Sequence, residues 1–246
     1  MDTSHFQYAE VGQTRRDLSL SKRGLLIGAA AGLLPASFAL ASPHDAQASV
    51  TPAAAMARLV AGNKRFSSGH ATHPDADAHR RQLIAAGQRP FATILSCADS
   101  RVPPELIFDQ GLGDLFVVRI AGNVVDDDVL ASIEYSVIHT GCTLVLVLGH
   151  ARCGAVSATI DALAGHGSPE DANTKIGSLA ALITPAVKAV PASARDPLDA
   201  AISINAQNSA AAILAGSPPL KTRADAGRLR IVAARYDLND GRVTYI

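Results

Sequence analysis

Three apolar runs of strand length constrain the fold of this chain more than any other feature. They are FATILSC at 91–97, LFVVRI at 115–120 and TLVLVLG at 143–149. Each run is almost continuously apolar, which is typical of strands that are buried on both faces of a parallel sheet. Apolar residues with helical spacing lie between the second and third runs, over 130–140, and resume after the third run near Gly154. The pattern predicts an α/β protein with a central, mostly parallel sheet flanked by helices.

The flanking segments complete this expected architecture. Thr51 and Pro52 suit the cap and first turn of a helix. The sequence after 229 reads as two β-rich stretches around Asn-Asp-Gly at 239–241, which predicts a hairpin and an antiparallel edge strand beside about four parallel strands. We expect further helices over 51–69, 80–86, 175–190 and 197–215, and loops over 165–171 and 216–227.

Composition excludes several classes of protein. Lys plus Arg and Asp plus Glu both number 22, so the net charge is zero, whereas a nucleic-acid-binding protein normally carries a basic excess. Apolar residues make up 48% of the chain, which excludes a wholly disordered protein. Three cysteines are too few for a disulfide framework and are available for other chemistry.

The first 48 residues have the features of an export signal. A basic segment at 14–23 precedes the uncharged stretch 24–41, and small residues at Ala46 and Ala48 form an A-x-A site. We therefore expect a signal peptide over 1–48, cleaved after Ala48 or after Ala41, and a single domain over 49–246 that is exported to the periplasm.

The export route and a membrane anchor are the alternatives that remain open at this point. Ser21-Lys22-Arg23 and Arg15-Arg16 each resemble a twin-arginine signal without matching it fully, so a Sec signal is the other route. Eighteen uncharged residues are at the short end of what spans a bilayer, and Gly, Ser and Pro35 dilute them. Cleavage is the better interpretation, with no stable membrane span in the mature protein.

Metal-binding side chains follow two of the three apolar runs. Cys97 ends the first run in SCADSR, and His150 and Cys153 follow the third in GHARCG. Ligands collect at the carboxyl ends of parallel strands, where the strand order reverses. Two thiolates and an imidazole suit zinc, and three protein ligands leave a fourth position open, as in catalytic zinc sites. The sequence predicts one catalytic Zn²⁺ per chain.

Asp99 has two alternative roles beside this site. Its carboxylate is a candidate fourth zinc ligand. Arg101 lies two residues further on, and a guanidinium and a carboxylate favour a bidentate pair. If Asp99 pairs with Arg101, the fourth position is left to water.

Other cysteine and histidine residues have simpler explanations. Cys142 precedes an apolar strand without polar partners, so we expect it in the core. His70, His73 and His79 lie in a polar loop without a cysteine, and we expect them to be solvated.

Longer motifs resemble the β-class carbonic anhydrases. The motifs are SCADSRVPPELIF, GDLFVVRIAGN, SIEYSV and VLVLGHARCGAV, supported by AGNKRF near residue 64 and the terminal YDLNDGRV. They cover residues 55–163 and, less strongly, 229–246. The resemblance implies zinc-dependent, reversible hydration of carbon dioxide to bicarbonate and a proton, by attack of a zinc-bound hydroxide. It also implies a homodimer or higher homo-oligomer with the active site at the subunit interface.

The resemblance also implies a role for individual residues. Zinc would be held by Cys97, His150 and Cys153, and Asp99 with Arg101 would form the catalytic dyad, in which Asp99 accepts a hydrogen bond from the reacting water. Four further residues would contact substrate: Gln88 as a donor to bicarbonate, Phe116 and Tyr135 as the aromatic lining of the pocket, and the Gly154 N–H as a further donor.

Two departures from the family pattern and two rival functions accompany this interpretation. Ile120 stands where the family usually has asparagine, and the chain has no tryptophan, which argues against the regulatory bicarbonate site of one subgroup. One rival is a related zinc hydrolase of carbon disulfide or carbonyl sulfide. The other is a non-catalytic zinc-binding protein, which would have no use for Asp99, Arg101 and Gln88.

Overall fold

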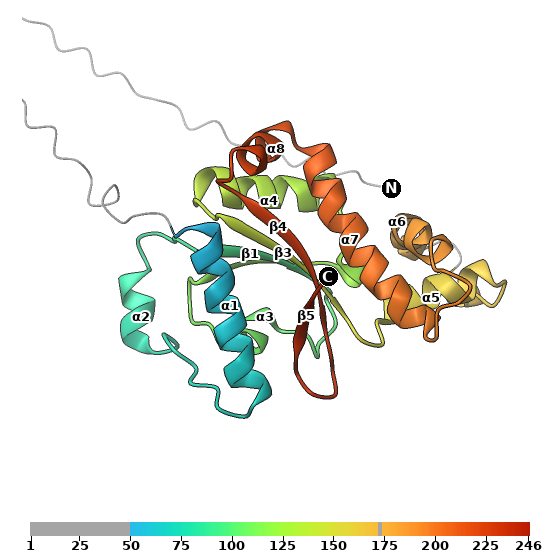
Figure 1. The fold of residues 1–246 in the computed structure, drawn as a ribbon, viewed down its shortest axis with the longest axis horizontal. Helices are drawn as coiled ribbons and strands as arrows, with labels where there is room; N and C mark the ends of the chain where they lie inside the picture. Colours follow the sequence, from blue (N-terminus) through green and yellow to red (C-terminus); the bar gives the residue numbers. More distant parts are fainter. Residues whose placement is uncertain (1–49, 172–173) are drawn as a thin grey trace, which may run out of the picture. The chain divides into compact units, whose positions relative to one another are not determined.

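A twisted five-stranded sheet runs through residues 50–171 and 174–246, which are the residues that the computed structural model describes (Figure 1). The predicted signal segment lies outside these residues. The strands occur in the order β2-β1-β3-β4-β5, and all neighbours are parallel except β4 and β5. The predicted arrangement of four parallel strands and one antiparallel edge strand is therefore confirmed. The strands are β1 Ala92–Ser96, β2 Leu115–Arg119, β3 Leu144–His150, β4 Arg230–Tyr236 and β5 Val243–Tyr245.

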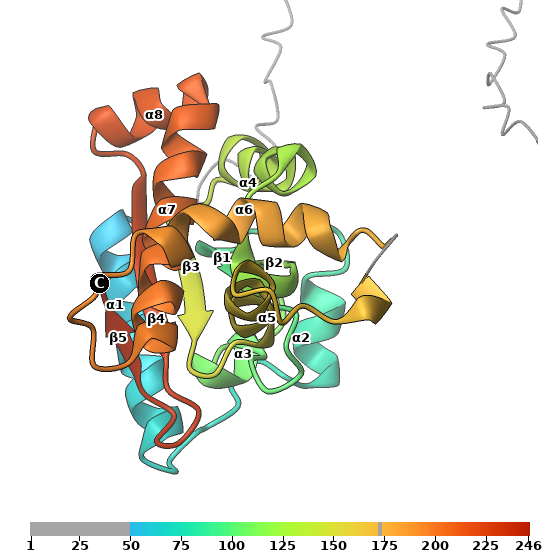
Figure 2. The same ribbon diagram turned by 90° about the vertical axis from the view of Figure 1, so that its right-hand side faces the viewer.

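Helices cover both faces of this sheet, with α1 and α7 on opposite sides (Figure 1). One face packs against α1 and α3, and the other packs against α4, α7 and α8. A third apolar cluster joins α5, α6 and α7 near the carboxyl end of β3 (Figure 2). The helices are α1 Pro52–Ser67, α2 Ala78–Leu83, α3 Pro104–Ile107, α4 Asp127–His139, α5 Gly154–Leu163, α6 Ile176–Lys188, α7 Pro197–Gly216 and α8 Pro218–Asp225, with 3₁₀ turns η1 Ala121–Asn123 and η2 Pro169–Asp171.

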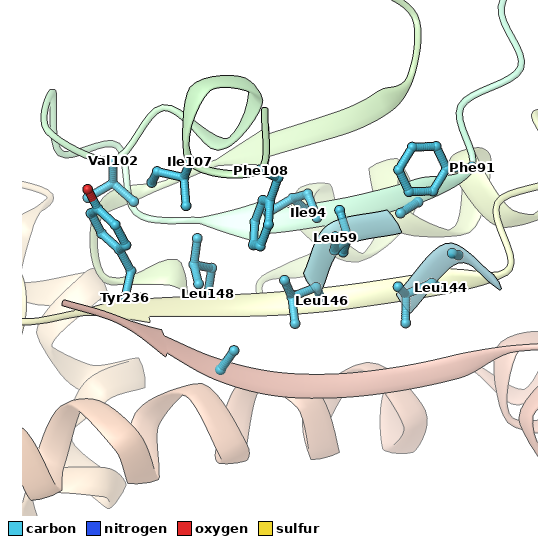
Figure 3. Packing of buried hydrophobic residues seen from close by; sticks show 13 residues of the cluster. Leu59, Phe91, Ile94, Val102, Ile107, Phe108, Leu144, Leu146, Leu148 and Tyr236 are labelled. Carbon is cyan, nitrogen blue, oxygen red and sulfur yellow. The ribbon is translucent and has the colours of Figure 1, made fainter. Parts of the chain in front are cut away.

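The central strand β3 explains why its sequence is continuously apolar. Leu144, Leu146 and Leu148 face the layer of α1 and α3, where Leu59 and Phe108 pack against the strands (Figure 3). Val145 and Val147 face the opposite layer. All seven residues of β3 are buried, because helices cover both of its faces.

Capping side chains explain where three of the helices begin. The Thr51 side chain accepts a hydrogen bond from the Ala54 N–H, as expected for the start of α1. The Asp77 side chain caps α2, which therefore begins two residues before the predicted start at 80 and ends at Leu83. The predicted start of α4 at 130 is also late, because Asp126 caps the helix.

The prediction of a loop over 216–227 is wrong, because α8 occupies most of that segment. Ser217 caps the helix by accepting from the Leu220 N–H, and Pro218 and Pro219 occupy its first turn. Proline favours the first turn of a helix, where its missing N–H has no intrahelical partner to lose. The same prolines suggest a loop when they are read without the preceding serine.

The strand order places the carboxyl ends of β1 and β3 side by side. β2 lies on one side of β1, and β3 lies on the other, paired from Thr93–Val145 to Ser96–Leu148. The order of strands therefore reverses between β1 and β3, and such a reversal opens a crevice for ligands at the carboxyl edge. No helix within the described parts of the chain is long and apolar enough to cross a membrane.

Candidate active site

Cys97, His150 and Cys153 meet at this edge of the sheet, as the sequence predicts. Cys97 follows β1, His150 is the last residue of β3, and Cys153 precedes α5, which begins beside the end of β3 (Figure 2). All three residues are buried, and their ligand atoms lie within 4.8 Å of one another. They form the only cluster of this kind found in residues 50–171 and 174–246.

The orientation of His150 fits a metal ligand. Its Nδ1 lies 3.0 Å from the Ala151 carbonyl oxygen, so Nδ1 carries the proton and donates. Its Nε2 is fully buried and has no hydrogen-bond partner among the described residues. A buried nitrogen lone pair without a partner is costly, and a metal held on the other side of an anchored imidazole removes that cost. The two sulfurs and this nitrogen are a donor set that zinc prefers.

The pKa values of the two cysteine thiols shift in opposite directions. A hydrogen bond from Cys153 lowers the pKa of Cys97 to about 4, and contacts with His150 and the Gly122 N–H add to this effect against the cost of burial. The hydrogen bond with Cys97, then burial and the charge on Cys97, raise the pKa of Cys153. Each negative sulfur thus disfavours a second charge beside it, and a bound cation would remove that penalty, because cysteine binds a metal as the thiolate.

Two residues that sequence reasoning did not identify hold the segment after Cys97. The Arg119 Nε donates to the Cys97 carbonyl oxygen at 3.1 Å, and its Nη2 donates to the Asp99 carbonyl oxygen at 2.6 Å. The Gly122 N–H donates to the Cys97 Sγ at 3.3 Å. Gly122 has a φ of 72°, a conformation that favours glycine. Both residues lie in the motif GDLFVVRIAGN, which indicated that the segment matters but not which backbone atoms these two residues contact.

Asp99 and Arg101 form a bidentate ion pair beside the cluster. The Arg101 Nε and Nη2 donate to the two carboxylate oxygens at 2.9 and 2.7 Å, and the Arg101 backbone N–H donates at 2.9 Å. This pairing holds the pKa of Asp99 well below its ordinary value. The Asp99 Oδ2 lies 3.8 Å from the His150 Nε2, so the carboxylate borders the cluster while Arg101 engages it.

The structure separates the four predicted substrate residues into two groups. Gly154 is the exposed first residue of α5, directly after Cys153. Phe116 pairs with Thr93 near the start of β1, which places it about 13 Å along the sheet from Cys97 at roughly 3.3 Å per residue.

Within one subunit, Tyr135 and Gln88 also lie away from the cluster of Cys97, His150 and Cys153. The Tyr135 ring lies 6.1 Å from the Phe116 ring and is half exposed. Gln88 is exposed and precedes β1, at the opposite end of that strand from Cys97. One chain thus brings together the metal-binding cluster, the Asp99–Arg101 pair and Gly154, but not Gln88, Phe116 or Tyr135.

Comparison with known proteins gives consistent results. The family model described as carbonic anhydrase matches residues 92–243. Carbonic anhydrase 2 of Mycobacterium tuberculosis is 41% identical over 194 residues, which cover 78% of this chain and 91% of that protein. The carbonic anhydrase of Mycolicibacterium smegmatis is 38% identical over 192 residues, covering 78% and 92% of the two chains.

Solved structures agree with the sequence comparisons. The Coccomyxa β-carbonic anhydrase, solved in complex with acetazolamide, has a TM-score of 0.59 and 26% identity, and the match covers 78% of this chain and 86% of that one. A tetrameric β-carbonic anhydrase of Sordaria macrospora has the same fold, with a TM-score of 0.59 at 20% identity over 78% and 96% of the two chains. With the cysteine–histidine cluster that fits zinc, these matches show that the chain belongs to the β-carbonic anhydrases, enzymes that hydrate carbon dioxide.

Proposed function

We propose that this chain hydrates carbon dioxide reversibly at the cluster of Cys97, His150 and Cys153, with Asp99 and Arg101 as its catalytic dyad. The observation that carries the proposal is the bidentate Asp99–Arg101 pair, whose carboxylate lies 3.8 Å from the unpartnered His150 Nε2. Zinc held by the three ligands would supply a water of near-neutral pKa as the nucleophile.

Asp99 orients the reacting water in this proposal. Arg101 donates to both carboxylate oxygens, so Asp99 stays ionised and remains a hydrogen-bond acceptor. The carboxylate would accept a hydrogen bond from the O–H of the reacting water or hydroxide. That hydrogen bond would orient a lone pair of the oxygen towards the carbon of carbon dioxide. The Arg119 clamp on the Asp99 carbonyl oxygen holds the segment that carries this carboxylate.

Bicarbonate would be bound by groups at the mouth of the cluster. The Gly154 N–H lies at the start of the ten-residue helix α5, and helix N-termini favour anions. Added atoms at the Gly154 Cβ position would meet nothing within 4 Å, so the surroundings leave room for a small anion.

Gln88, Phe116 and Tyr135 act in this proposal through a homodimer. All three residues lie away from the cluster of their own chain. We therefore assign to them a contact with the substrate bound at the cluster of the partner subunit. Ile138 is exposed on α4, the helix that carries Tyr135, and Leu83 and Leu112 are exposed shortly before Gln88 and β2 in the sequence. The strand β2 is also an edge strand. The relative from Sordaria macrospora is a tetramer by its published description, which supports an oligomer.

Stopped-flow hydration of carbon dioxide, with zinc analysis of the same sample at mildly alkaline pH, tests the main proposal. We expect rapid hydration and about one zinc per chain. Full zinc without hydration of carbon dioxide contradicts it. Release of hydrogen sulfide from carbon disulfide by that sample would support the related hydrolase, and no turnover of either compound would support a non-catalytic zinc protein.

We also propose that residues 1–48 are an export signal, twin-arginine or Sec, and that residues 49–246 act in the periplasm as one catalytic domain. The basic segment at 14–23 and the A-x-A site before Ser49 support this proposal. Mass spectrometry of the periplasmic protein should find Ser49 at its N-terminus. An intact Met1 in the membrane fraction would instead show that the segment is an anchor.

A further inference from the structure

Asn205 is a buried polar residue that the chemistry above does not use. It lies on α7, is only 2% exposed, and comes from a part of the chain far from all three cluster residues. Its Nδ2 donates a hydrogen bond of 2.7 Å to the carbonyl oxygen of Gly122. A buried amide with a single long-range backbone partner suggests a specific task at that partner.

Gly122 connects this hydrogen bond to the cluster. Its N–H donates to the Cys97 Sγ at 3.3 Å, and its φ is 72°. The N–H and the carbonyl of one residue belong to different peptide planes, and the φ and ψ angles of that residue set their relative orientation. A donor that fixes the carbonyl of Gly122 therefore also helps to aim its N–H at the sulfur.

Gly122 is closely packed, so the orientation of its N–H depends on the residues that contact it. A Cβ atom at Gly122 would lie 2.7 Å from the Ile183 Cδ1, so α6 packs closely over this turn. Gly122 is buried, so it is costly to leave its carbonyl oxygen without a hydrogen-bond partner.

The helix that carries Asn205 is itself anchored next to another cluster residue. A Cβ atom at Gly149, the residue before His150, would lie 3.2 Å from the Ile202 Cγ2 and 3.4 Å from the Ile202 carbonyl oxygen. The backbone of α7 thus comes close to β3 at its carboxyl end. One helix contacts both the strand that presents His150 and the turn that donates to Cys97.

We infer that Asn205 is a positioning residue of the metal centre, acting through Gly122 on the sulfur of Cys97. The inference rests on the proposed function in that the cluster holds zinc. A hydrogen bond to a metal-bound thiolate orients the ligand and stabilises its charge, and loss of such outer partners commonly weakens metal binding. Asn205 touches neither metal nor substrate, and its effect passes through the glycine.

The rate of zinc release from the purified holoenzyme to an excess of chelator tests this inference. Asn205→Leu keeps a similar side-chain volume but removes the amide that donates to Gly122. Asn205→Ala removes the amide and most of the side-chain volume, and it provides the measurement if the leucine variant does not fold. We expect release about tenfold faster in either variant. The cobalt-substituted variants should also show a shifted or weaker sulfur-to-cobalt absorption band, a signature of the changed sulfur environment.

Two residues of the same helix provide matched controls. Ser209 is buried one turn further along α7, and Asn208 is exposed. Ser209→Ala and Asn208→Ala should release zinc at the wild-type rate, even where Ser209→Ala lowers the melting temperature.

The possible outcomes separate this inference from the proposed function. Wild-type release rates and an unchanged cobalt spectrum in both Asn205 variants would overturn the inference alone, since wild-type protein with one zinc leaves the centre itself in place. Equally fast release in Ser209→Ala would also overturn it, because α7 would then act only through general stability. A wild-type protein that binds no zinc would overturn the proposed function, and this inference with it.

Discussion

At the scale of single residues, the candidate site depends on charged groups that are paired before any substrate arrives. Arg101 engages both oxygens of Asp99, and Arg119 holds the backbone on either side of Ala98. Such pre-orientation matters because a catalytic acceptor must lie within hydrogen-bond reach of the proton it accepts. The ligands alone, without this pair, would define a zinc site but not its reactivity.

The Asp99–Arg101 pair should therefore be needed for rate and not for zinc. We expect Asp99→Ala and Arg101→Ala to retain about one zinc per chain and to lose hydration activity by about 10²–10⁴-fold, the usual contribution of a positioned acid–base group. Zinc analysis and stopped-flow hydration of the same samples provide the measurement. Normal hydration by both variants would show that the pair is not the dyad.

At the scale of secondary-structure elements, Asp109 joins segments that would otherwise be separate. Its buried carboxylate accepts from the Arg65 side chain on α1, from the Thr72 backbone N–H and hydroxyl, and from the His73 N–H. Burial disfavours the charged form, but these donors outweigh that cost and lower the pKa of Asp109 to about 2. This cluster of hydrogen bonds ties α1 and the loop before α2 to the end of α3.

The low pKa of Asp109 predicts how stability depends on pH. Because the folded pKa lies below the ordinary value of 3.8, ionised Asp109 stabilises the fold fully above about pH 4, and this contribution is lost as pH falls towards 2. Asp109→Asn should lower the free energy of unfolding by about 1–3 kcal/mol at pH 7, with a smaller difference from wild type in acid. Urea unfolding at pH 7 and pH 3 measures this, with Asp75→Asn as an exposed control. An equal loss at both pH values would contradict the assignment.

At the scale of the whole molecule, the proposed dimer would complete each site with residues from the partner. Tyr135 and Ile138 are exposed on α4, and the Tyr135 ring lies 6.1 Å from the Phe116 ring of the edge strand β2. Apolar residues that are exposed singly are common on protein surfaces, whereas neighbouring ones beside an edge strand are typical of an interface.

Ile138→Glu should separate the subunits without disturbing the metal centre. We expect a monomer by light scattering, about one zinc per chain, and a large loss of hydration activity because the partner's residues are gone. Leu163→Glu, a change of similar exposure on α5, should leave both assembly and activity unchanged. A dimeric and fully active Ile138→Glu protein would exclude α4 from the interface.

Local sequence patterns are enough to predict the sheet, its helical layers and the three candidate metal ligands. Apolar runs and cap residues are local signals, since burial on two faces leaves a continuous apolar run and a capping side chain lies next to its helix. Cys97, His150 and Cys153 follow the ends of such runs, so the general rule for the carboxyl ends of parallel strands predicts that they meet if the two strands are neighbours. The pairing of β1 with β3 meets that condition. The helix α8 was missed because Pro218 and Pro219 suit both a loop and a helix start.

The groups that surround these residues could not be predicted from local patterns. Arg119 and Asn205 act on backbone carbonyl groups of distant segments, and a side chain that bonds a backbone oxygen 83 positions away, as Asn205 does, leaves no periodicity or motif in the sequence. The separation of Phe116 from Cys97 likewise follows from strand register, which long-range pairing sets. Local patterns therefore specify which groups are present, whereas packing between distant elements specifies how those groups are held.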